Sequence, residues 1–481
     1  MLKKISARLF KNGSPKETIL KNTFWLLLGQ VLGRLIRTAL IVYAARVLGA
    51  GSWGAFSYAL SLAAFLSIFS DLGLNAFTTR ELSREGTKNF SLLSAGFFVK
   101  FFFTALLIVL AFLFSSYLSP LEEARGLIFI AVLIFAFDSV RDFGSSLTRA
   151  AEKMEIESSV NIFTNLMIAA LGFLLLFSFK NSFSLAWGYA LGSLSGSILM
   201  IFAVRKTFPL FLKKINFSDI KRVLSLSLPF SVMSIMGAVM INTDIVIISW
   251  MLGAEATGLF AAAEKPIQLL YLLPSVFAAS LFPMMSRISE NKNGEFKKVF
   301  EKSISAVLAL ALPISFGGFI LSENIIRLLY GPAYLASGLS FAILSLTIFI
   351  IFPSIIIGNA VFALNEQKKL IAFSCFGMLG NIILDIVLIP KFGIAGCAFA
   401  TLLNQLAINT YLLFRVKKIV SFSLFPHLKK IILASLLMSA LTFSLFYFEF
   451  HLISNILLSS LFYLALLLLF KEKLLFSLFK K

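Results

Sequence analysis

The sequence has little of what a water-soluble enzyme needs. Of its 481 residues, only two are cysteine and two are histidine, and 23 acidic residues stand against 43 basic ones. Both cysteines, Cys375 and Cys397, fall in apolar segments, so we expect no disulfide framework. The two histidines lack metal-ligand spacing, and no stretch is long and polar enough to form a soluble domain. These absences argue against an enzyme with a catalytic loop domain.

The chain is instead rich in long apolar runs. Hydrophobic residues make up 59% of it and its mean hydropathy is +0.94, above the 45–50% apolar content of soluble domains. Runs of roughly 18–25 residues, which is the length of a membrane span, recur from end to end. We predict an all-α integral membrane protein with about 14 transmembrane helices, at 19–43, 52–72, 91–114, 126–147, 157–179, 183–204, 223–249, 258–284, 303–321, 337–362, 369–389, 393–414, 428–448 and 452–470.

The net charge of +20 raises the question of nucleic-acid binding. With the N-terminus inside, most Lys and Arg residues fall in cytoplasmic segments, and the outer loops hold only Arg46, Arg125, Lys180, Arg327 and Lys391. This bias follows the positive-inside rule, so the charge indicates topology and attraction to anionic lipid headgroups rather than a nucleic-acid partner. We expect a multi-pass protein of a bacterial inner membrane or an archaeal cell membrane, with both termini cytoplasmic. Residues 1–18 read as a basic interfacial segment before an uncleaved first helix.

A motif that occurs twice indicates internal symmetry. Leu48-Gly49-Ala50, followed by Gly54 and Phe56, returns as Leu252-Gly253-Ala254, followed by Gly258 and Phe260, at a constant offset of 204 residues. We predict two pseudo-symmetric six-helix lobes in the same orientation, plus two extra C-terminal helices. The predicted parts are an N-lobe at 19–204, a basic linker at 205–222, a C-lobe at 223–414, and spans 13 and 14 with a basic tail at 415–481. Two related halves that rock around a cavity favour a transporter.

Charged residues inside predicted spans are candidate functional residues, because charge in the bilayer is costly. In the first half, Arg34 and Arg37 are nearest to mid-membrane and are the best candidates to bind an anionic substrate, through the bidentate fit of guanidinium to phosphate. Further candidates are Lys100 and Arg141, with Lys265 of the second half as a weaker partner. For Arg141 the alternative is internal pairing, since Asp138 and Asp142 lie at helical spacing on either side of it.

The second half presents acidic and amide side chains instead. Asp244 lies on the seventh predicted span, Asn381 and Asp385 lie one turn apart on the eleventh, and Thr401 follows on the twelfth. Carboxylate, amide and hydroxyl oxygens suit a hard cation such as Na⁺, or a proton. The alternative is that these groups only hydrogen-bond neighbouring helices. No other cofactor is expected.

Several of these segments carry a family resemblance. The stretches Ala45–Gly49, Trp53–Ser57, Asp71–Asn75 and Ile389–Gly396 resemble the Wzx-type polysaccharide flippases of the multidrug/oligosaccharidyl-lipid/polysaccharide exporter superfamily. The resemblance implies a two-lobed helical flippase that moves a polyprenyl-diphosphate-linked oligosaccharide from the cytoplasmic to the outer leaflet.

The resemblance also implies a coupling ion. The related lipid II flippases have a sodium site in the second lobe, and its pattern matches this chain at Asp244, Asn381, Asp385, Cys397 (through its carbonyl) and Thr401. We expect a monomer that contacts membrane lipids and associates with polysaccharide-assembly enzymes. The alternatives are a cation-coupled multidrug exporter of the same superfamily and, from a different class, a membrane-embedded glycosyltransferase or glycan polymerase.

Overall fold

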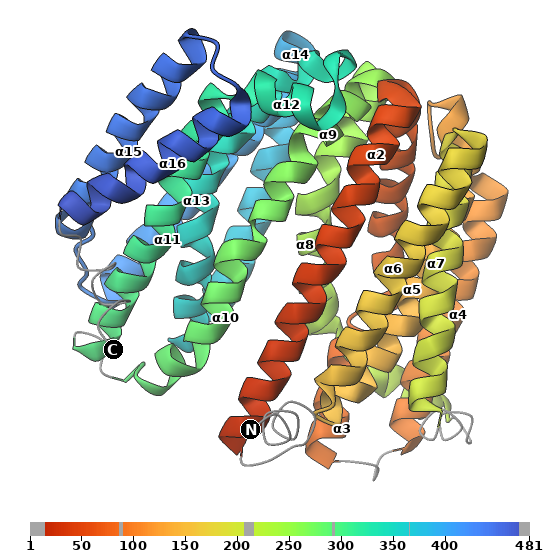
Figure 1. The fold of residues 1–481 in the computed structure, drawn as a ribbon. Helices are drawn as coiled ribbons and strands as arrows, with labels where there is room; N and C mark the ends of the chain where they lie inside the picture. Colours follow the sequence, from red (N-terminus) through yellow and green to blue (C-terminus); the bar gives the residue numbers. More distant parts are fainter. Residues whose placement is uncertain (1–14, 86–89, 206–215, 291–293, 365, 471–481) are drawn as a thin grey trace, which may run out of the picture. The chain divides into compact units, whose positions relative to one another are not determined.

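The computed structural model describes residues 15–85, 90–205, 216–290, 294–364 and 366–470 (Figure 1). These residues are mostly α-helical and contain no β-strand, which confirms the predicted all-α class. Most of the predicted interfacial segment 1–18, much of the linker 205–222 and the end of the basic tail lie outside the described residues, so those predictions have no structural counterpart here.

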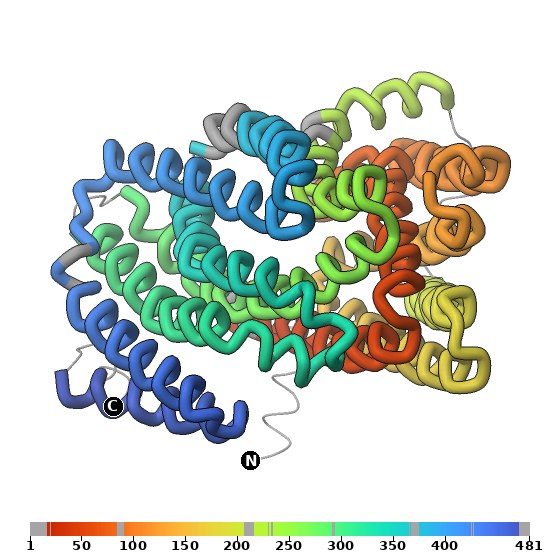
Figure 2. Tube along the Cα trace, turned by 90° about the horizontal axis from the view of Figure 1, so that it is seen from above, coloured from red at the N-terminus to blue at the C-terminus, as the bar shows by residue number. Residues whose placement is uncertain are grey.

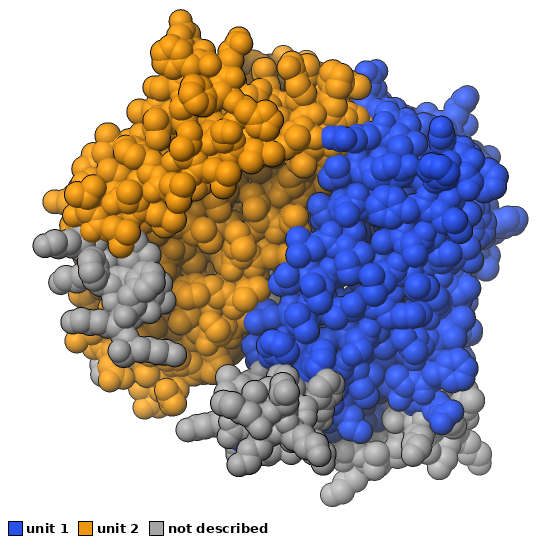
Figure 3. Space-filling model, in the orientation of Figure 1, with its two compact units in different colours: residues 1–258 blue, residues 259–481 orange. Residues whose placement is uncertain are grey.

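Contacts divide the chain into two compact units, residues 1–258 and 259–481 (Figure 3). The first unit contains α2 (Pro15–Asp71), α3 (Leu74–Glu85), α4 (Phe90–Phe114), α5 (Glu122–Ala150), α6 (Met154–Phe179), α7 (Ser182–Val204), α8 (Phe217–Leu252) and the start of α9 (Ala254–Leu270). Helix α8 belongs to this unit because it packs against α2, α3 and α4. The grouping by contact does not test the lobe boundaries 19–204 and 223–414, which stay predictions.

The second unit contains the rest of α9 and all later elements. These are α10 (Leu272–Arg287), α11 (Glu295–Ile320), α12 (Ser322–Tyr330), the 3₁₀ helix η2 (Pro332–Ser337), α13 (Gly338–Ala363), α14 (Gln367–Ile419), α15 (Phe425–Tyr447) and α16 (Leu452–Leu469). Helix α13 packs against α10, α11 and α14, while α15 and α16 pack against α11 (Figure 2). The Tyr463 hydroxyl of α16 donates to the carbonyl of Ala309 on α11, at 2.7 Å. Spans 13 and 14 are therefore attached to the second unit through α11.

Within the described residues, eleven helices are long and apolar enough to cross a membrane. Two of them, α2 (57 residues) and α14 (53 residues), would each extend about 80 Å if straight, far more than one bilayer. Each is interrupted by a glycine with a positive φ, Gly49 (74°) in α2 and Gly393 (60°) in α14. Glycine adopts such a backbone conformation without the steric cost that a side chain would add. Helix α5 has sufficient length too but is charged in its second half. The chain is a multi-pass membrane protein, and the count of 14 spans stays a prediction.

The two copies of the repeated motif meet inside the first unit. A Cβ atom at Gly54 would lie 1.8 Å from the carbonyl oxygen of Ala254, and one at Gly258 would lie 1.9 Å from that of Ala50. The contact is thus reciprocal, with equivalent residues of the two copies facing each other. Only glycine allows backbones to approach this closely. The repeated motif therefore forms the close contact between α2 and α9.

Candidate functional site

A polar cavity of about 200 Å³ opens within the first unit. Its lining comes from α2, α5 and α6 and contains three arginines and three amide side chains, with one glycine: Gln30, Gly33, Arg34, Arg37, Arg141, Asn161 and Asn165. Three of the predicted substrate-binding residues, Arg34, Arg37 and Arg141, thus line one cavity. Gln30, Arg34 and Arg37 share a face of α2 because they are spaced by four and three residues.

Close packing of α2 against α6 brings the amides to the cavity. The amide of Asn161 donates to the carbonyl of Gly29 at 3.1 Å, and the Ser158 hydroxyl donates to the carbonyl of Trp25. At Gly33 a Cβ atom would lie 2.8 Å from Asn165 Nδ2. Gly33 therefore leaves the room that Asn165 occupies beside the cavity.

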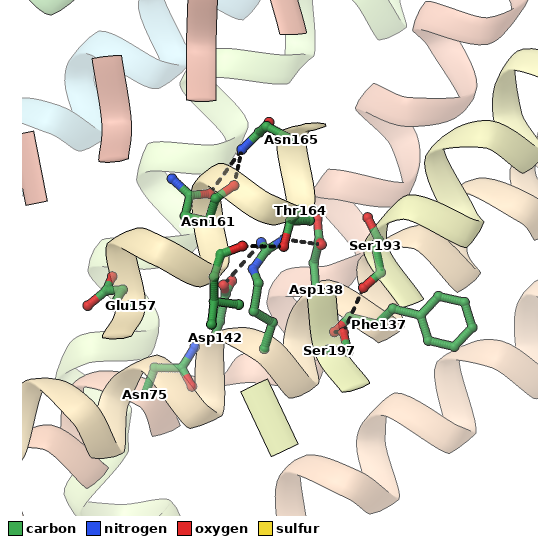
Figure 4. Close-up of polar contacts among 12 residues, drawn as sticks. Asn75, Phe137, Asp138, Asp142, Glu157, Asn161, Thr164, Asn165, Ser193 and Ser197 are labelled. Atoms are coloured by element: carbon green, nitrogen blue, oxygen red, sulfur yellow. Dashed lines mark hydrogen bonds and ion pairs between the residues drawn. The ribbon is translucent and has the colours of Figure 1, made fainter. Parts of the chain in front are cut away.

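Arg37 is held by two neutral groups. Its Nε donates to Asn165 Oδ1 at 3.0 Å, and its guanidinium lies over the ring of Tyr189, 5.7 Å from the ring centroid. Asn165 is itself fixed, since its Nδ2 donates to the backbone oxygen of Asn161 at 2.8 Å and to Oδ1 of the same residue at 3.1 Å (Figure 4). This arrangement orients Arg37 without cancelling its charge and leaves both Nη groups as donors.

Arg34 and Arg141 differ in their charge environment. Arg34 is exposed to the cavity, feels the like charge of Arg37, and makes no ion pair with any acidic side chain in the part of the chain that the structure describes. Arg141 Nη1 lies 2.7 Å from Asp138 Oδ1 and its Nη2 lies 3.3 Å from Asp142 Oδ1 (Figure 4). The internal pairing considered for Arg141 therefore occurs, and Arg141 lines the cavity as well.

The other two predicted substrate residues lie elsewhere. Lys100 on α4 is 4% exposed, and its Nζ contacts Asp71 Oδ1 at 2.6 Å and Asn75 Oδ1 at 2.9 Å. It does not line the cavity, and its charge is balanced by Asp71. Lys265 belongs to the second unit, where its Nζ lies 3.4 Å from both Glu264 Oε2 and Gln268 Oε1. Roles for these two lysines in substrate binding stay predictions.

In the second unit, α14 gathers the predicted cation ligands around its break. Asp385 is fully buried and accepts a hydrogen bond from Asn381 Nδ2 at 3.0 Å. Beyond Gly393 the chain turns back, so that the sulfur of Cys397 lies within 4.8 Å of a carboxylate oxygen of Asp385. The Thr401 hydroxyl donates to the carbonyl of Cys397 at 3.1 Å. The sulfur of Cys397 is thus the group of that segment placed near Asp385, and Thr401 is bonded to the Cys397 carbonyl. Carboxylate, carbonyl and hydroxyl oxygens are the ligand types that a hard cation prefers.

Asp244 is buried on α8, at 6% exposure, and belongs to the first unit. Its participation in the α14 group stays a prediction. The sequence did not point to Asn404, whose Nδ2 donates to Asn381 Oδ1 at 3.3 Å, or to Gln30 and Asn161 in the cavity. The spacing of Asn161 and Asn165, one turn apart, was the signal available for the latter.

Comparison with known proteins agrees with this architecture. A family model described as polysaccharide biosynthesis protein matches residues 19–289. The chain is 24% identical over 394 residues to the probable low-salt glycan biosynthesis flippase Agl15 of Haloferax volcanii, covering 82% of each protein. Among solved structures, it resembles the lipid II flippase MurJ in an inward closed conformation, with a TM-score of 0.77, 22% identity, and coverage of 93% of this chain and 98% of that one.

A more distant structural match extends the comparison. An outward-facing multidrug resistance MATE family transporter of the MOP superfamily gives a TM-score of 0.55 at 13% identity, covering 86% of this chain and 97% of that one. The likeness to these two solved structures concerns the fold. The resemblance inferred from the sequence is confirmed, and the chain belongs to the polysaccharide biosynthesis protein family.

Proposed function

We propose that this protein is a flippase that moves a lipid-diphosphate-linked oligosaccharide, a precursor of a cell-surface polysaccharide, from the cytoplasmic to the outer leaflet by alternating access. The observation that carries the proposal is the cavity lined by Arg34, Arg37 and Arg141 on helices of a membrane protein. Intramembrane charge is costly and is kept where a substrate uses it. Guanidinium groups match the geometry of phosphate oxygens, and the neighbouring amides suit sugar hydroxyls.

The cavity disfavours the multidrug alternative. A cationic drug would approach Arg34 and Arg37, whose charges no acidic side chain in the described residues cancels, and would be repelled. An anionic diphosphate would be attracted by the same two groups. The relative named above is described as a probable flippase of glycan biosynthesis, and a glycan substrate is consistent with the family description.

The test is reconstitution of the full chain in liposomes with a fluorescent polyprenyl-diphosphate glycan, following its transfer between leaflets. The double variant Arg34→Ala/Arg37→Ala should reduce transfer to the rate of empty liposomes. Lysine at both positions should restore only part of the rate, because an ammonium keeps the charge but loses the bidentate geometry. Arg205→Ala, at the exposed end of α7, removes one cation outside the cavity and is the control. Full activity in the double alanine variant would overturn the proposal.

We further propose that transport is coupled to a cation bound by Asp244, Asn381, Asp385, Thr401 and the Cys397 carbonyl. Support comes from contacts on both sides of the break in α14: Asn381 donates to the buried carboxylate of Asp385, the Cys397 sulfur lies within 4.8 Å of a carboxylate oxygen of Asp385, and Thr401 donates to the Cys397 carbonyl. The pattern of ligands is the only reason to propose Na⁺ rather than a proton as the coupling ion. A bound cation would reduce the electrostatic repulsion between the carboxylates of Asp244 and Asp385. If the cation binds one conformation of the protein more tightly than the other, it shifts the population towards that conformation.

Ion coupling is tested in the same liposomes with Na⁺ or choline outside. Wild-type transfer should depend on Na⁺, and Asp385→Asn should remove that dependence, whereas Glu290→Gln in an exposed loop should leave it unchanged. Wild-type rates that are equal in Na⁺ and choline but respond to a pH gradient would show that the coupling ion is a proton and not Na⁺.

We also propose a plasma-membrane location with both termini cytoplasmic and a monomeric chain associated with polysaccharide-assembly enzymes, as the distribution of basic residues and the family suggest.

A further inference from the structure

Arg141 differs from the other two cavity arginines because it has resident counter-ions. Its guanidinium is 13% exposed and pairs with Asp138, which is 16% exposed, at 2.7 Å. It also pairs with Asp142, which is 52% exposed, at 3.3 Å. Arg37 is held by the neutral Asn165 and Tyr189 instead. An anion can therefore reach Arg34 and Arg37 directly, but must compete with a carboxylate to reach Arg141.

The two carboxylates are not equivalent competitors. Asp138 lies three residues before Arg141 on α5, is largely buried and makes the shorter contact, so it is suited to hold the guanidinium in place. Asp142 makes a longer contact and is half exposed, and ion pairs of that kind are weak. Asp142 is thus the carboxylate that an incoming phosphate can displace.

We propose that Asp142 is a release-promoting residue, whose carboxylate competes with the substrate phosphate for Arg141 and takes the guanidinium back as the substrate leaves. The inference rests on the proposed flippase function and deepens it. A flippase gains nothing from tight binding, because the lipid must leave the cavity on the far side for turnover. Asp142 does not itself line the cavity, but a competitor paired with Arg141 lowers affinity and speeds dissociation without removing the cations that capture the substrate.

The experiment measures binding and transfer together. The full chain in nanodiscs of zwitterionic lipid is titrated with a fluorescent polyprenyl diphosphate, and the same variants are assayed in liposomes. Asp142→Asn should bind the probe about two- to fivefold more tightly, the range expected for an exposed ion pair, with slower dissociation and a lower maximal transfer rate. A folding defect would also slow transfer but would weaken binding, so the tighter binding distinguishes the two explanations. Glu122→Gln, an exposed acid on the same helix, is the matched control and should change neither quantity.

A double-mutant cycle assigns the effect to Arg141. In an Arg141→Gln background, Asp142→Asn should no longer tighten binding, because the group for which it competes is gone. If wild type binds and transfers the probe but Asp142→Asn binds equally or more weakly, the role of Asp142 is overturned while the flippase proposal stands. If wild type fails to bind or transfer the probe, both are overturned.

Discussion

Arg34 and Arg37 lie three residues apart on α2, yet their surroundings differ. Arg37 is anchored through Nε by Asn165 and stacked over Tyr189, whereas Arg34 is exposed to the cavity and has Arg37 as a like-charged neighbour. A long side chain loses rotamer entropy when it binds, and anchoring it beforehand reduces that cost. Asn165 therefore acts as a positioning residue for Arg37.

Replacing Asn165 with Ala should weaken binding of the diphosphate probe about tenfold, the loss expected for a hydrogen bond to a charged group. The arginine keeps its charge but loses its orientation, so the defect should lie mainly in affinity and be partly restored by Gln. Equilibrium binding in nanodiscs measures it. Asn409→Ala is the control, because among the described residues the amide of Asn409 bonds only to Gln405, one turn earlier on α14. Unchanged binding in Asn165→Ala would show that the Arg37 contact is dispensable.

The sequence identified the cavity arginines because intramembrane charge stands out in an apolar chain. It did not show that Lys100 is balanced by Asp71, since the partner lies 29 residues away at the end of a long helix. It also missed Gln30 and Asn161, because neutral amides are common in membrane helices and only tertiary packing places them beside the arginines. Charge can be read from one segment, whereas pairing depends on how several helices meet.

At the scale of elements, the spans predicted at 91–114, 157–179, 183–204 and 452–470 agree closely with α4, α6, α7 and α16. The short helices α3 and α12 were not predicted, because they contain several polar residues and do not form apolar runs. Asn165 on α6 and Asn381 on α14 serve different partners. The first accepts a hydrogen bond from Arg37 and the second donates one to Asp385, so an asparagine supports a basic side chain in one unit and an acidic one in the other.

The reciprocal crossing of the repeated motif gives a prediction for α2 and α9. Gly54→Ala should lower the thermal stability of the purified protein strongly, because its Cβ would lie 1.8 Å from the Ala254 carbonyl oxygen and the two helices would have to separate. Gly51→Ala, only three residues earlier, meets nothing within 4 Å and should be neutral or slightly stabilising. The measurement is the apparent Tm in detergent. Equal Tm values for the two variants would contradict the close contact.

At the scale of the whole molecule, orientation in the membrane determines which way the substrate moves. The predicted outer loops contain few Lys and Arg residues, and by the positive-inside rule this asymmetry predicts an orientation with both termini cytoplasmic. Two described, exposed positions sample the two expected sides: Tyr117 between α4 and α5, 80% exposed, on the outside, and Glu290 after α10 on the cytoplasmic side.

The small number of cysteines makes this orientation directly measurable. Cys397 is fully buried, so a Cys375→Ser background should react little with a membrane-impermeant maleimide. In that background Tyr117→Cys should be labelled on intact cells, whereas Glu290→Cys should be labelled only after permeabilisation. The reverse pattern would invert the topology, and with it the proposed transfer from the cytoplasmic to the outer leaflet. Labelling of both positions on intact cells would contradict a single orientation, and the basic residues would then need another explanation than topology.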